Sequence, residues 1–104
     1  MYEWASENPD KVACVYAENP RMHSALAKTQ PLDHLAPLAK ANVPLLHVCG
    51  SLDPWFKDNT LEVAKRYRKL GGRMKVIVKK GVGHYPLAPE DPTVVVNFIT
   101  QAAA

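Results

Sequence analysis

Three short apolar runs, separated by segments of helical character, constrain the fold of this chain more than any other feature. The runs occupy residues 11–17, 43–49 and 74–79. Each is short and bounded by turn residues, as buried strands are. Helices are expected around them, at residues 1–7, 32–41, 59–70 and from 91 onward. Strands that alternate with helices pair in parallel, so we predict an α/β fold: a three-layer α/β/α domain with three parallel strands joined by crossover helices.

Two of these helices carry boundary signals in the sequence. Asn59 and Glu62 form an Asn-x-x-Glu version of the capping box, which predicts that the third helix begins at Asn59. The glycine pair 71–72 supplies a left-handed stop for it. The last helix is expected to begin at residues 91–92, because proline is tolerated in a first helical turn. Its predicted buried stripe consists of Val95, Phe98, Ile99 and Ala102.

The composition fits a single globular domain over residues 1–104. The chain is 47% hydrophobic and 22% charged, and it has no apolar stretch near the roughly 20 residues that a membrane span requires. Residues 1–7 lack the basic start and apolar centre of a secretory signal. We therefore expect a cytoplasmic protein, or an exported one whose signal has been lost.

Charge and cysteine content argue against several kinds of partner. The net charge is +3, but the basic residues do not form one patch, since one group lies on the third helix and another on the third strand and its exit, so no nucleic-acid binding is predicted. Cys14 and Cys49 lie in apolar runs and are interpreted as buried thiols. Two cysteines without a Cys-x-x-Cys spacing give no metal signal, and no cofactor is predicted.

Asp53 and His84 each follow a predicted strand. Loops beyond the carboxyl ends of parallel strands are where ligands and catalytic groups collect, so these two residues suggest the acid and base of a Ser-His-Asp relay. Trp55 and Phe56, next to Asp53, would then line an acyl or leaving-group pocket, or would pack over the end of the sheet. His47 lies inside its strand and is expected to be a hydrogen-bonded core residue.

The nucleophile of such a relay is absent from the sequence. The serines are Ser6, Ser24 and Ser51, and none stands in a Gly-x-Ser-x-Gly turn. Without small residues on both sides, a serine does not readily occupy the tight strand-to-helix turn that exposes its hydroxyl. We therefore expect the isolated chain to be inactive as a hydrolase.

The segments at residues 43–53, 64–67, 71–72 and 76–78, together with Gly83-His84, resemble the carboxyl-terminal half of α/β-hydrolase-fold serine hydrolases of the esterase and peptidase-like kind. The resemblance implies that Asp53 is the triad acid and His84 the triad base. It also implies that the chain begins just after the missing serine. The substrate class would be carboxylic esters or related acyl compounds. The alternative is a non-catalytic, truncated domain.

The resemblance also leads to an expectation about partners. In that family the strand at residues 11–17 would pair with the strand that carries the nucleophile, which is missing here. An unpaired strand edge offers free backbone groups to other chains. We therefore expect a homodimer, or a separate amino-terminal partner chain, bound through residues 11–17.

Overall fold

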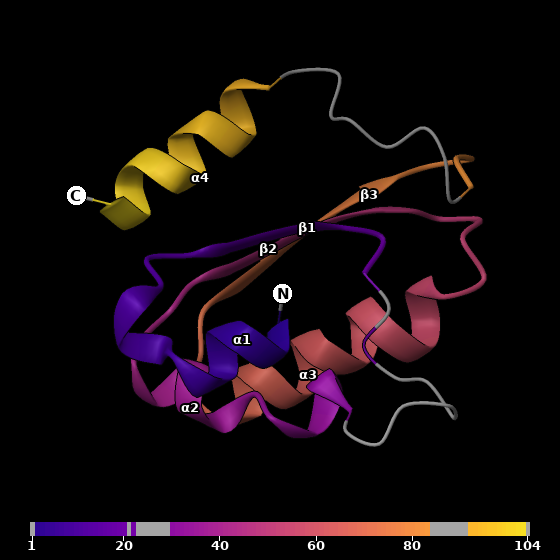
Figure 1. The fold of residues 1–104 in the computed structure, drawn as a ribbon. Coiled ribbons are helices and arrows are strands. Elements are labelled where there is room, and N and C mark those ends of the chain that lie inside the picture. Colours follow the sequence, from indigo (N-terminus) through magenta and orange to yellow (C-terminus); the bar gives the residue numbers. More distant parts are fainter. Residues whose placement is uncertain (1, 21, 23–29, 84–91, 104) are drawn as a thin grey trace.

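The computed structural model describes residues 2–20, 22, 30–83 and 92–103. Its centre is a sheet of three parallel strands in the order β1-β2-β3 (Figure 1). The strands are β1 (Val15–Glu18), β2 (Leu45–Gly50) and β3 (Met74–Lys79). The predicted α/β class and the three parallel strands are thus confirmed.

Helices lie on both faces of this sheet. They are α1 (Tyr2–Glu7), α2 (Ala36–Lys40), α3 (Glu62–Lys69) and α4 (Thr93–Ala103). Figure 1 shows α1, α2 and α3 gathered on one face and α4 on the other. Every residue of β2 is buried, because this strand is central in the sheet and helices cover both of its faces (Figure 1).

The core between the sheet and the first three helices centres on Tyr67. Its ring has no exposed surface, and its hydroxyl donates a hydrogen bond to the carbonyl oxygen of Val43. A Cβ at Gly72 would lie 2.3 Å from this ring, so the ring packs directly on the backbone that ends α3. Gly71 adopts a φ of +85°, which confirms the left-handed stop expected from the glycine pair.

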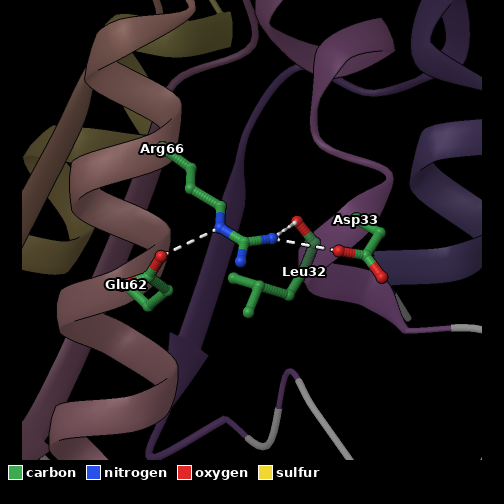
Figure 2. Close-up of polar contacts among 4 residues, drawn as sticks. All are labelled: Leu32, Asp33, Glu62 and Arg66. Atoms are coloured by element: carbon green, nitrogen blue, oxygen red, sulfur yellow. Dashed lines mark hydrogen bonds and ion pairs between the residues drawn. The ribbon is translucent and has the colours of Figure 1, made fainter.

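Arg66 ties α3 to the segment before α2 (Figure 2). Its Nε donates to Glu62 Oε1 at 3.0 Å within the helix, and its Nη1 donates to Asp33 Oδ1 at 3.0 Å. The same Nη1 also lies 3.4 Å from the carbonyl oxygen of Leu32. Because all three side chains are at least a third exposed, the ion pairs position the segment more than they stabilise the fold.

Several predicted element boundaries were wrong. The first strand begins at Val15 rather than residue 11, because Pro9–Lys11 form a 3-10 turn that delays it. The predicted helix at 32–41 is divided into a 3-10 turn at Pro31–Asp33 and the short helix α2. Pro37 is accommodated in the first turn of α2, where its missing N–H costs no intrahelical bond.

The capping box predicted at Asn59 is also wrong. A π-helical segment, Phe56–Leu61, precedes α3 and runs directly into it. Asn59 is buried in the middle of this segment, and its Oδ1 accepts a hydrogen bond from the backbone N–H of Met22. The side chain is used for a contact distant in sequence, so it does not cap the helix.

The predicted burial of the last helix is only partly correct. No residue of α4 is buried. Val95, Phe98 and Ala102 are half-buried, whereas Ile99 is 44% exposed. A hollow of about 280 Å³ lies between α4 and the start of β3, lined in part by Phe98 and Met74. Thus α4 rests on the sheet without close packing, and its predicted start at Asp91 lies outside the described residues.

The two cysteines differ in burial. Cys49 is fully buried in β2, as predicted, but Cys14 is only half-buried because it comes just before the edge strand β1. In the part of the chain that the structure describes, no helix is long and apolar enough to cross a membrane.

Candidate functional site

Asp53 lies in a tight turn at the carboxyl end of β2. Its backbone N–H donates to the carbonyl oxygen of Gly50 at 3.1 Å. Its Oδ1 accepts a hydrogen bond from the backbone N–H of Trp55, also at 3.1 Å. The side chain is only 5% exposed. The carboxylate is therefore held in one position by the turn that it helps to form.

The loop after β3 packs against this turn. The backbone N–H of Leu52 donates to the carbonyl oxygen of Val82 at 2.9 Å, and Ser51 N–H donates to Lys79 O at 3.0 Å. The hydroxyl oxygen of Ser51 accepts a bond from Gly81 N–H at 2.7 Å. Three hydrogen bonds thus connect the loops that follow β2 and β3.

Gly50 is the point of closest approach between these loops. A Cβ placed on Gly50 would lie 2.1 Å from the carbonyl oxygen of Val82 and 2.2 Å from that of Gly83. No side chain fits at such distances, so only glycine allows the two backbones to pack this closely. The glycine that ends β2 therefore sets how near the second loop comes to Asp53.

His84, the predicted base, lies outside the described residues, and the prediction that it approaches Asp53 stays a prediction. The described chain reaches Gly83, the residue directly before it, and Gly83 packs on Gly50. Gly50 is joined to Asp53 by the turn hydrogen bond.

Of the predicted substrate-binding residues, Trp55 directly precedes the π-helical segment beyond Asp53 and Phe56 is its first residue. Trp55 is 40% exposed, and its carbonyl oxygen accepts a hydrogen bond from Asn59 Nδ2 at 2.8 Å. Phe56 is half-buried, and its backbone N–H donates to Asp53 O at 3.1 Å. The backbones of both aromatic residues are thus fixed beside Asp53 by hydrogen bonds, and Trp55 is partly open to solvent.

Asn19, at the end of β1, belongs to the same edge and was missed by the sequence reasoning. It is buried, has a φ of +43° and accepts a hydrogen bond at Oδ1 from the backbone N–H of Gly50 at 3.1 Å. The signal was the pair Asn19-Pro20 directly after a strand, since asparagine tolerates positive φ better than most residues. Asn19, Asp53 and Gly83 thus bring the ends of all three strands together.

A network of buried polar side chains lies beneath this edge of the sheet. The hydroxyl of Tyr2 lies 2.6 Å from His47 Nε2, and His47 Nδ1 lies 2.9 Å from Thr60 Oγ1. Thr60 Oγ1 is also 3.0 Å from the sulfur of Cys49. These contacts join α1, β2 and the π-helical segment, and they confirm His47 as a hydrogen-bonded core residue.

Burial keeps the titratable side chains of this hydrogen-bonded network neutral. It lowers the pKa of His47 to about 4, and it raises the pKa values of Tyr2 and Cys49 above their ordinary values. Removing water disfavours the charged form of each group. Cys49 is therefore a protonated thiol and not an activated nucleophile.

Among the described residues, no three His, Cys, Asp or Glu side chains gather as metal ligands would. Comparison of the chain with protein-family models and with curated proteins gives no match.

Proposed function

We propose that this chain supplies the acid and the base of an α/β-hydrolase-type serine hydrolase, with Asp53 as the acid and His84 as the base. The observation that supports this best is the packing of Gly83 on Gly50. It holds the loop leading to His84 against the turn that contains a buried carboxylate. The substrate class would be carboxylic esters or related acyl compounds.

In the complete site, the imidazole of His84 would remove the proton from a serine hydroxyl as the oxygen attacks the acyl carbon. It would then return this proton to the leaving group. Asp53 would hold the imidazole in the required tautomer and stabilise its cation. The serine and the oxyanion donors would come from outside these 104 residues, because the sequence contains no nucleophile turn.

A purely structural role of Asp53 is the competing explanation. Its Oδ1 already accepts the bond from Trp55 N–H, which is what an aspartate in a turn does without any catalytic role. The two explanations differ in one property. Only a catalytic acid must interact with His84, and this interaction would raise the pKa of the imidazole.

The first prediction is therefore that the pKa of His84 depends on Asp53. The Asp53→Asn variant keeps the carbonyl oxygen that accepts the turn hydrogen bond but removes the charge. We expect it to lower the pKa of His84 by about one unit or more, because a neighbouring carboxylate favours the imidazolium. The measurement is an NMR titration of the imidazole signals, with His84 assigned from the His84→Gln variant.

Two further variants sharpen this test. Asp58→Asn removes a charge from an exposed residue of the nearby π-helical segment and should leave the pKa of His84 unchanged. Gly50→Ala forces the two loops apart and should weaken the effect of Asp53, provided that the variant remains folded. A His84 pKa that is the same in wild type and Asp53→Asn would rule out the proposed relay.

A further inference from the structure

The outer edge of β1 presents backbone groups that can pair with another strand. Val15 N–H and Asn19 N–H donate to carbonyl oxygens of the β2 segment at 3.0 Å each. Because backbone groups alternate in direction along a strand, those of Cys14, Tyr16 and Glu18 point away from β2. In the described part of the chain, β1 pairs with β2 alone, so this edge is available for association.

A groove accompanies the edge. It has a volume of about 300 Å³ and lies between α1 and β1, lined by Trp4, Ala5 and residues 11–16. Trp4 is 54% exposed although its ring is large and apolar. Exposed apolar surface beside an unpaired strand edge is typical of a site where another chain binds.

The opposite edge of the sheet, at β3, differs in charge. This strand and its flanks carry four cations and no acidic residue, namely Arg73, Lys75, Lys79 and Lys80. Two such edges would repel each other, and edge lysines are a common protection against strand pairing. The β1 edge carries fewer charges. Lys11 lies in the 3-10 turn before the strand, and Glu18 lies at its carboxyl end, where one oxygen accepts a hydrogen bond from the Tyr16 hydroxyl.

We propose that a second copy of this chain pairs with β1 in antiparallel orientation, about a twofold axis near Val15. The orientation follows from charge. Lys11 lies in the 3-10 turn before β1, and an antiparallel pair turns this end of each chain towards Glu18 of the other protomer, whereas a parallel pair would bring like charges to the same end. An antiparallel pair about a twofold axis also closes on itself as a dimer. The two sheets then join through β1, and Trp4 becomes covered. This dimer does not depend on the roles of Asp53 and His84, but it occupies the β1 edge, so it excludes a nucleophile-bearing partner strand from the same edge.

The dimer can be tested by sedimentation of the wild-type chain and charge variants. At low micromolar concentration we expect a species of twice the 11.5 kDa mass of one chain. Both Glu18→Lys and Lys11→Glu should weaken dimerisation by about tenfold at low salt, because each puts like charges together at both ends of the interface. The double variant Lys11→Glu/Glu18→Lys should restore it. Asp58→Lys makes the same charge change at a distant exposed residue and should have no effect.

Hydrogen exchange of the wild-type chain provides a second measurement that needs no variant. Dimer formation should slow exchange of the Cys14, Tyr16 and Glu18 amides as concentration rises. A chain that stays monomeric at high micromolar concentration would overturn the proposal. So would a dimer that is unchanged in both single variants, or one that protects amides of β3 instead.

Discussion

The imidazole of His47 has no exposed surface, and both of its nitrogens contact hydroxyl groups, those of Tyr2 and Thr60. The hydroxyls satisfy its hydrogen bonds but carry no charge, so they do not compensate an imidazolium for the loss of water. This explains why the pKa of His47 falls to about 4. The residue is a polar part of the core, and its neutral form stabilises the folded state.

We predict that His47 makes the protein sensitive to acid. The folded-state pKa of about 4 lies below the ordinary value near 6.5, so the unfolded state binds the proton first. The stabilisation is fully present above about pH 6.5 and is lost progressively as pH falls towards 4. The total loss in the free energy of unfolding is about 3 kcal/mol. Denaturant unfolding at several pH values measures this loss.

The control for this prediction is a pair of variants. His47→Gln cannot titrate and should show a flatter decline in the free energy of unfolding between pH 6.5 and 4, whatever its stability at pH 7. His34→Gln, at an exposed position, should behave as wild type does. Equal slopes for wild type and His47→Gln would refute the assignment.

At the scale of secondary structure, the local sequence pattern predicted which helices and strands form more accurately than it predicted where each begins and ends. Residues 74–79 were predicted correctly because β3 follows from an apolar run bounded by turns. The start of α3 was missed because Asn59 bonds Met22, a partner 37 positions away. The partial exposure of α4 was missed because an apolar stripe on a helix does not indicate how closely other elements pack against it.

The contact between Asn59 and Met22 leads to a prediction of its own. Both residues are almost fully buried, so Asn59→Ala leaves the N–H of Met22 without its acceptor. We expect the free energy of unfolding to fall by about 1–3 kcal/mol, the cost of an unsatisfied buried donor. Thermal or denaturant unfolding measures the change.

Two further asparagine variants separate this hydrogen bond from side-chain volume and helix propensity. Asn59→Asp keeps the side-chain volume and an acceptor for Met22 N–H, but it removes the Nδ2 donor to Trp55 O and buries a charge beside that carbonyl, so it should be no more stable than Asn59→Ala. Asn97→Ala removes an exposed asparagine from α4 and should cost little. If Asn59→Ala were as stable as Asn97→Ala, the contact would have no energetic importance.

For the whole molecule, the sequence predicted which loops meet but not how they are held together. Asp53 was found because it follows an apolar run, and parallel strands bring the loops after them to one edge. The need for glycine at residue 50 and the role of Asn19 depend on backbone approaches between separate strands. Such contacts leave no periodic signal in the sequence, so they could only be found in the fold.

The last prediction concerns catalysis by the whole chain. The sequence has no serine in a nucleophile turn and no glycine-rich oxyanion loop, and the proposed dimer adds neither. Loss of one oxyanion donor alone costs about 10²–10³ in rate. We therefore expect the chain to hydrolyse a short-chain nitrophenyl ester little faster than free imidazole does, at a rate per chain that is independent of concentration.

The control is the His84→Ala variant, which should lose only this weak imidazole reaction. Saturable turnover that His84→Ala abolishes, but that survives a serine-directed phosphonate, would instead reveal a nucleophile other than serine within these 104 residues.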